Sequence, residues 1–161
     1  MKKRPLFSAV LFLLLLHAAL AQAQQLSVQN GSGKPTVLTR ADLEALPHVK
    51  VTTTKSGTST VFEGIAIAAV LEKAGIQLGE TFRGKRLASC LLVEAADGYR
   101  AVIALPEIDP AFTDKQIVLA FLKDGKPMDD KEGPYRIVIP DEKRMARWAR
   151  QVTMLRVVEV Q

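Results

Sequence analysis

The N-terminal stretch constrains this chain most, because it separates a leader from the residues that remain to form a domain. Positive charge at residues 2–4 is followed by an almost wholly apolar run at residues 6–16 and by the small-x-small pattern Ala21-Gln22-Ala23. These three zones are typical of a signal peptide that is cleaved after Ala23. The apolar run is shorter than the ~20 residues of a membrane-spanning helix. We therefore predict a signal peptide at residues 1–23 and a periplasmic or secreted protein with no membrane anchor after cleavage.

The remaining chain, residues 24–161, has the length of one domain. Removal of the leader takes away three of the 22 Lys and Arg residues and none of the 17 Asp and Glu residues, which leaves a net charge of about +2. A charge this small argues against the extended basic surface that nucleic-acid binding requires. We therefore expect a single domain with no nucleic-acid partner.

The residue types that build most metal and redox sites are scarce. Cys90 is the single cysteine, so no disulfide can form within the chain, and His48 is the one histidine outside the leader. This scarcity removes most zinc sites and most His-based catalysis, and we predict no metal bound by protein side chains. Cys90 lies within an expected strand, where a small structural thiol is the usual interpretation and a reactive thiol the alternative.

Two helices are indicated in the first half of the chain. The clearer one follows Gly64 and has apolar residues at the spacing of one helix face, with Gly75 placed for a left-handed C-terminal cap. A shorter helix is predicted between Thr39, whose spacing to Asp42 resembles a capping box, and Pro47. The apolar residues of the predicted helices and strands are expected to face one core. We predict that this core contains Phe62, Ile67, Val70, Leu71, Leu119, Phe121, Ile137 and Ile139.

Most of the other segments are predicted to be β-strands. Runs of β-branched and apolar residues indicate them, and turn residues such as Asp97-Gly98 and Asp124-Gly125 separate them. The predicted strands cover residues 26–28, 36–38, 49–54, 60–62, 87–95, 99–103, 117–122, 135–139 and 152–160. Residues 117–122 are continuously apolar, which favours burial on both faces. Because the order lacks a regular βαβ alternation, we predict an α+β domain with mixed or antiparallel β-sheets and few short helices.

The clearest charge pattern lies at residues 143–150, which we predict to form a short helix. One face would be basic and the other apolar: Lys143, Arg144, Arg147 and Arg150 against Met145, Trp148 and Ala149. Guanidinium groups match phosphate oxygens two at a time, so the basic face suits a phosphate-bearing ligand or an acidic protein surface. A solvated amphipathic helix is the alternative. The sequence has no nucleophile-elbow, zinc-protease, Walker or dinucleotide-binding motif.

Several short motifs occur in an order that resembles the molybdopterin-binding domain of the sulfite-oxidase-like oxidoreductases. The resemblance covers residues 49–158, and its motifs are Phe62-Glu63-Gly64-Ile65, Leu71-Glu72-Lys73-Ala74-Gly75, Asp97-Gly98-Tyr99, Asp124-Gly125-Lys126-Pro127, Gly133-Pro134-Tyr135-Arg136 and Arg147-Trp148. Their order is specific, although no single motif is. The resemblance implies a mixed α+β fold and identifies the chain as a small stand-alone exported member of that family.

The resemblance also implies a cofactor and the residues that approach it. The family binds molybdopterin, a pterin that bears a pyrophosphate and carries molybdenum. Position by position, Arg136 matches the arginine of the family's Pro-x-Arg strand, and Arg144 and Arg147 match basic residues that approach the cofactor. Tyr99 matches a tyrosine near the metal. We therefore expect these four residues to border one cleft that binds a pterin or another anionic ligand.

One departure from the family bears on catalysis. The family's metal-ligating cysteine precedes the Phe-x-Gly motif, where this sequence has Val51-Thr52-Thr53-Thr54-Lys55-Ser56 and no cysteine. Threonine hydroxyls cannot replace a soft thiolate ligand. One hypothesis is a molybdopterin-dependent oxidoreductase served by a periplasmic redox partner, and a second is a domain that binds a pterin or anion without catalysis. A third is a non-catalytic protein-interaction module that has lost the cofactor.

Overall fold

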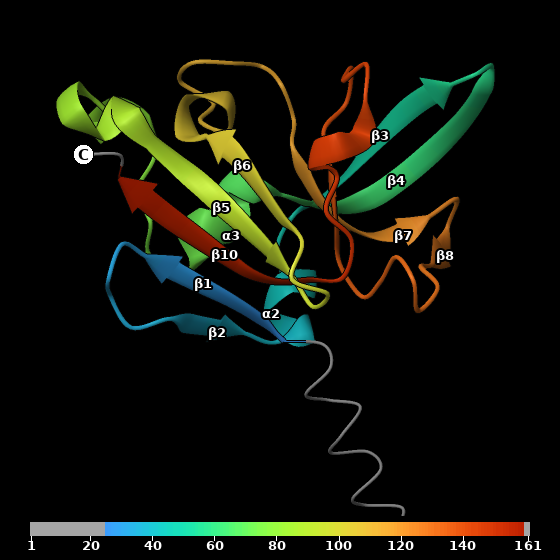
Figure 1. The fold of residues 1–161 in the computed structure, drawn as a ribbon, viewed down its shortest axis with the longest axis horizontal. Coiled ribbons are helices and arrows are strands. Elements are labelled where there is room, and N and C mark those ends of the chain that lie inside the picture. Colours follow the sequence, from blue (N-terminus) through green and yellow to red (C-terminus); the bar gives the residue numbers. More distant parts are fainter. Residues whose placement is uncertain (1–24, 160–161) are drawn as a thin grey trace, which may run out of the picture.

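The computed structural model describes residues 25–159, and these residues form two sheets with few helices (Figure 1). The predicted signal peptide lies outside the described residues, and so does the last residue of the strand predicted at 152–160. Among residues 25–159, no helix has the length and apolar character needed to span a membrane. The sheets are mostly antiparallel, so the predicted α+β class is confirmed.

The first sheet has five strands in the order β2-β1-β10-β5-β6. Their bounds are Leu26–Asn30 for β1, Thr36–Leu38 for β2, Ser89–Ala95 for β5, Arg100–Ala104 for β6 and Val152–Glu159 for β10. β1 and β10 run in parallel, whereas the other neighbours are antiparallel. The predicted hairpin at Asp97-Gly98 joins β5 to β6, and Gly98 has the positive φ of 83° that the turn needs.

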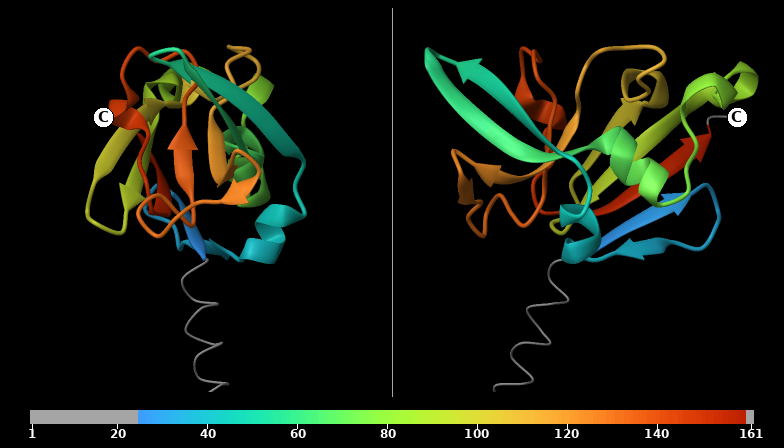
Figure 2. Two further views of the ribbon diagram at one scale, coloured as in Figure 1. Left: turned by 90° about the vertical axis from the view of Figure 1, so that its right-hand side faces the viewer. Right: turned by 180° about the vertical axis from the view of Figure 1, so that it is seen from behind.

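The second sheet has the order β3-β4-β7-β8, and β9 also pairs with β7. The strand bounds are His48–Lys55 for β3, Thr58–Ala66 for β4, Val118–Lys123 for β7, Lys126–Pro127 for β8 and Arg136–Val138 for β9. β3 and β4 form a long hairpin that projects beyond the rest of the sheet (Figures 1 and 2). Ser56 and Gly57 make its two-residue turn with φ of 50° and 79°, which matches a type I′ turn.

Two α-helices connect these strands. α2 (Arg40–Glu44) begins with the predicted capping box between Thr39 and Asp42. α3 (Ile67–Lys73) ends as predicted at Gly75, whose φ is 86°, and it covers one face of the first sheet (Figures 1 and 2). Four short 3₁₀ helices complete the described chain: η1 (Gly79–Thr81), η2 (Gly84–Ala88), η3 (Leu105–Glu107) and η4 (Met145–Arg147).

One hydrophobic core includes residues of both sheets and of α3. Each of the eight predicted core residues belongs to it and is at most 3% exposed. β7 is buried on both faces over Val118–Phe121, as its apolar run predicts. Gly64 allows β4 to approach β7 closely, because a Cβ atom there would lie 2.1 Å from the carbonyl oxygen of Leu119.

The helix predicted at residues 143–150 is wrong. Only Met145–Arg147 forms a 3₁₀ turn, and the chain around it is irregular. Tertiary hydrogen bonds take the place of helical ones: the N–H of Ile137 donates to the carbonyl of Ala149 at 2.8 Å, and the N–H of Gln151 donates to that of Glu132 at 3.1 Å. The apolar anchor of this segment is nevertheless buried, because Trp148 is 5% exposed and Ala149 2% exposed.

Candidate functional site

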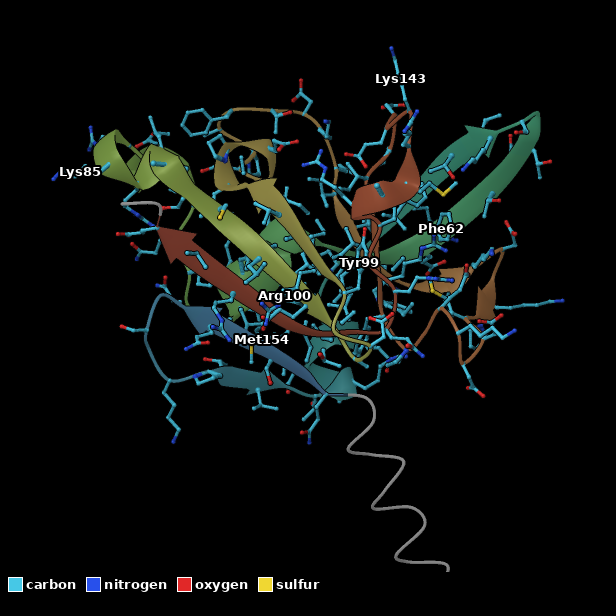
Figure 3. All side chains as sticks on the ribbon, viewed as in Figure 1. Phe62, Lys85, Tyr99, Arg100, Lys143 and Met154 are labelled. Carbon is cyan, nitrogen blue, oxygen red and sulfur yellow. The ribbon has the colours of Figure 1, made fainter. Side chains whose placement is uncertain are left out.

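A cleft of about 470 Å³ lies between the tip of the β3–β4 hairpin and the segment 141–148. We call it the hairpin cleft, and it is lined by Thr52, Thr53, Thr54, Lys55, Ser56, Asp141, Glu142, Lys143, Met145 and Trp148. Figure 3 shows Lys143 extending from the loop that forms the wall opposite the hairpin. The segment that lacks the family's cysteine therefore contributes half of the lining.

The lining places this cleft along the free edge of β3. Five consecutive residues of β3 and its turn contact the cleft, whereas no residue of β4 does. Side chains of successive strand residues point to opposite faces, so a cavity over one face of the hairpin would also touch β4. Within the described sheet β3 pairs with β4 alone. A ligand in the cleft therefore meets threonine and serine hydroxyls and an unpaired strand edge.

Trp148 forms the floor of the hairpin cleft, and Phe62 and Arg136 pack against it without lining the cleft. Trp148 contacts Phe62 edge to face, with ring centroids 5.9 Å apart. The Arg136 guanidinium carbon lies 5.7 Å from the Phe62 centroid and 5.6 Å from the Trp148 centroid. Its Nη1 donates to Glu132 at 2.5 Å. Arg136 therefore supports the floor from below, with its charge already paired to a carboxylate.

The Arg147 guanidinium supports the wall through two carboxylates. Its Nε donates to Glu142 Oε1 at 2.7 Å, and its Nη1 and Nη2 donate to Glu107 at 3.1 and 3.2 Å. Nη1 also lies 3.4 Å from the carbonyl oxygen of Val102 on β6. Hydrogen bonds from Arg147 hold the pKa of Glu107 below its ordinary value, and Glu107 in turn raises the pKa of Arg147. This network fixes Glu142 to η3 and β6.

Two polar atoms of the lining residues are buried without a hydrogen-bond partner. They are the indole N–H donor of Trp148 (Nε1) and the carboxylate acceptor of Glu142 (Oε2). Arg136 Nε, beneath the floor, is a third such atom. A buried polar group without a partner costs about 1–3 kcal/mol, so such groups usually mark the place of a missing water or ligand. Two residues that line the hairpin cleft thus each hold a buried polar atom, one donor and one acceptor, without a hydrogen-bond partner.

The four predicted site residues do not converge on one open point. Arg136 is paired below the floor and Arg147 within the wall, while Arg144 is exposed to solvent. The Tyr99 hydroxyl donates to the carbonyl of Ala146 and borders a separate hollow of about 200 Å³, beside Arg150 (Figure 3). Their role in binding a cofactor stays a prediction.

The sequence did not single out Glu107 and Glu142, which engage Arg147, and it pointed to Thr52–Thr54 only through the missing cysteine. Glu107 is 40 residues from Arg147 in the chain, and no sequence motif joins them. Glu142 is five residues away, a spacing that no regular helix brings face to face. A pattern search in one sequence has no signal for such contacts.

The donor set of the cleft does not suit a metal bound through a protein thiolate. Cys90 lies on β5 in the other sheet, half-buried, and does not line the cleft. Met145 contributes a sulfur, which lies 3.9 Å from Arg136 Nη2. Across residues 25–159, no three His, Cys, Asp or Glu side chains gather as a metal-ligand group. The lining offers hard oxygen and nitrogen groups, whereas a soft thiolate ligand is missing.

Comparison with known proteins gives a family and a fold. The sequence model described as "Oxidoreductase molybdopterin binding domain" matches residues 17–161. The solved structure of the sulfane dehydrogenase SoxCD from Paracoccus pantotrophus is similar, with a TM-score of 0.65 at 19% sequence identity. The match covers 85% of this chain and 38% of that chain, so this chain spans well under half the length of its structural relative. No curated protein sequence matches it.

Proposed function

Because this chain belongs to the oxidoreductase molybdopterin-binding domain family, we propose that it binds a pterin with an anionic tail, or a similar anionic ligand, in the hairpin cleft. In this proposal it acts as an exported binding protein and does not itself catalyse molybdenum-dependent oxidation. The observation that carries the proposal is the pair of unpartnered polar atoms, Trp148 Nε1 and Glu142 Oε2, in the lining of one cleft.

The cleft fits the organic part of the cofactor. A pterin ring carries both carbonyl acceptors and N–H donors, which complement the indole N–H and the carboxylate oxygen. Lys55 and Lys143 lie on the exposed rim and make no ion pair with a described residue, so they are free to meet a phosphate or carboxylate. The hydroxyl groups of Thr52–Thr54 add donors and acceptors.

The cleft does not fit the metal part. Molybdenum carried by the pterin supplies the redox chemistry of the family when a protein thiolate completes its coordination, and the lining has no thiolate. The predicted leader supports the same proposal, because it has Lys3-Arg4 in place of the twin arginines that mark transport of folded, cofactor-loaded proteins.

Analysis of protein purified from its native compartment tests the division between pterin and metal. We expect released pterin, or binding of added 6-carboxypterin, without stoichiometric molybdenum. Stoichiometric molybdenum would overturn the binding-only function, and the absence of any pterin binding would overturn the ligand assignment.

Trp148→Phe tests the site. Phenylalanine keeps an aromatic ring on the floor but removes the indole N–H, so affinity for 6-carboxypterin should fall about tenfold, the value of one hydrogen bond. Calorimetric titration measures it. The matched control is Phe82→Leu, a buried aromatic residue that does not line the cleft. Equal losses in both variants would indicate a general loss of packing.

A second candidate function is docking of a partner protein. The free edge of β3 favours it, because unpaired strand edges accept extended segments of other chains. This candidate takes the place of the first if neither a pterin nor another small anion binds. Chemical cross-linking in the native compartment, with a reagent-reactive residue placed at Thr52, would then identify the partner.

A further inference from the structure

The position of Glu142 in the hairpin cleft carries an inference about which ligands the cleft accepts. One carboxylate oxygen, Oε1, is occupied by Nε and Nη2 of Arg147. The other oxygen, Oε2, is buried and has no hydrogen-bond partner. An ionised carboxylate accepts hydrogen bonds and cannot donate them. Glu142 Oε2 is therefore an unoccupied hydrogen-bond acceptor, whereas the other lining residues offer both donors and acceptors.

Glu142 is not free to turn away from this position. Arg147 is held from its other side by Glu107 and by the carbonyl oxygen of Val102. Lys115 lies 3.9 Å from Glu107, so the ammonium of Lys115 and the guanidinium of Arg147 together match the carboxylates of Glu107 and Glu142. Neither Lys55 nor Lys143 forms an ion pair with Glu142 among the described residues. Arg147 contacts Oε1 of Glu142 alone, so Oε2 is left for a ligand to meet.

We propose that Glu142 Oε2 accepts a hydrogen bond from an amino group of the ligand and thereby restricts the cleft to dipolar ligands. Such a ligand carries an N–H donor at one end and, at the other, an anionic group that the rim lysines Lys55 and Lys143 bind. The proposal rests on the proposed function, because it names the specificity of the same cleft.

The chemistry of selection follows from the carboxylate. A simple anion such as pyrophosphate meets the lysines but has no N–H group for Oε2, and its negative charge lies near that oxygen, so its binding is weakened. A ligand with a carbonyl where the donor should be places two acceptors against each other and leaves Oε2 unpaired. A site that hydrogen-bonds a ligand strongly rejects an analogue without the matching group, because a buried polar group of the site then has no partner.

Ligand entry requires a local shift, since both unpartnered atoms are buried. The side chains available to move are exposed: Lys55 and Ser56 at the hairpin tip, and Lys143 on the opposite wall. Rotamer changes of this size are common when interfaces form. Trp148 is the single tryptophan of the sequence, so its fluorescence reports the shift directly.

The experiment compares three probes by calorimetry on the full protein and on Glu142→Gln. The probes are 6-carboxypterin, 6-carboxylumazine, in which a carbonyl replaces the 2-amino group, and inorganic pyrophosphate. Wild type should prefer 6-carboxypterin to 6-carboxylumazine by at least about tenfold, the value of one hydrogen bond to a charged group. Glu142→Gln should lose this preference, because the glutamine amide also donates, and should bind pyrophosphate more tightly than wild type does.

The matched control is Glu63→Gln, which removes an ion-paired and partly buried carboxylate on β4 outside the cleft. It should leave the preference unchanged. If Glu142→Gln does not fold, Glu107→Gln serves instead, because it loosens Arg147 while the Glu142 carboxylate remains. Glu107 acts through Arg147 as a positioning residue, so that variant should show a smaller loss of preference.

The outcomes separate this inference from the proposed function. If wild type binds none of the three probes, the proposed function fails and the inference falls with it. If wild type binds 6-carboxypterin and Glu142→Gln keeps the same preference, only the inference is overturned. Non-additive stabilities of Trp148→Phe and Glu142→Gln without ligand would also overturn it, because they would show that the two atoms satisfy each other.

Discussion

Arg136 lies beneath Trp148 of the cleft floor and Arg147 holds Glu142 of the cleft wall, and the two arginines have opposite kinds of environment. The Arg136 side chain is 10% exposed, pairs with Glu132 and lies over two aromatic rings. The Arg147 side chain is 33% exposed and joins two carboxylates from separate segments. The first arginine is enclosed by packing, whereas the second is held by charge at the boundary with solvent.

The difference separates a residue that holds the fold from one that shapes the site. Removing one partner of a buried ion pair leaves the other charge uncompensated, which costs about 3–5 kcal/mol. An ion pair near the surface contributes about 1 kcal/mol or less, because water screens it. Arg136 should therefore control stability, and Arg147 should control where Glu142 lies. The predictions below test this division from the largest effect to the smallest.

Arg136→Ala should destabilise the protein by about 3 kcal/mol, the lower end of the range for a buried pair, because Lys123 also pairs with Glu132 and keeps it partly compensated. The free energy of unfolding from denaturant titration measures the effect. Arg144→Ala is the control, since Arg144 is exposed and should change stability by less than about 0.5 kcal/mol. Similar losses in the two variants would contradict the distinction between floor and surface.

This distinction could not be predicted from the sequence, although much of the fold could. The sequence predicts α3 from its helical period and β7 from its continuous apolar run, because packing on a core imposes both patterns. Residues 143–150 also have a helical period, but their backbone pairs with residues near β9 instead. Tertiary contacts overrode local preference there, and the basic residues that a helix would have aligned were dispersed.

The hairpin cleft was not predicted from the sequence, which placed the site at Tyr99, Arg136, Arg144 and Arg147. The missing cysteine directed attention to residues 51–56, and most of that segment lines the cleft. The pairing of each arginine with a carboxylate depends on Glu107, Glu132 and Glu142, which only the folded chain brings into reach. An arginine that looks free in a sequence is therefore weak evidence for an anion site.

Arg147→Met should sharpen the comparison. Methionine keeps much of the apolar stem but removes the guanidinium, so stability should fall by only about 1 kcal/mol. Without Arg147, the Glu142 carboxylate is free to turn, and the preference for 6-carboxypterin over 6-carboxylumazine should drop to about that of Glu142→Gln. Calorimetry on the single and double variants measures both. A double variant that loses more preference than either single variant would show that Arg147 does not act through Glu142.

The smallest expected effect is the pH dependence of the wall. The pKa of Glu107 is held below its ordinary value of 4.5, chiefly by the hydrogen bonds from Arg147. Folding therefore favours the ionised carboxylate, so its contribution to stability is complete above pH 4.5 and is lost as the pH falls through the lower pKa of the folded state. Glu107→Gln lacks this contribution at every pH. The melting temperature of wild type should exceed that of Glu107→Gln at neutral pH, and the gap should close as the pH falls below 4.5.

The carboxyl groups of Asp42 and Glu63 also have lowered pKa values, but both proteins contain them, so the difference between the two melting curves isolates Glu107. Because the pair lies near the surface, the gap corresponds to about 1 kcal/mol or less, and added salt should narrow it. A gap that stays constant from neutral to acid pH would mean that Glu107 supports the wall by packing and not by its charge.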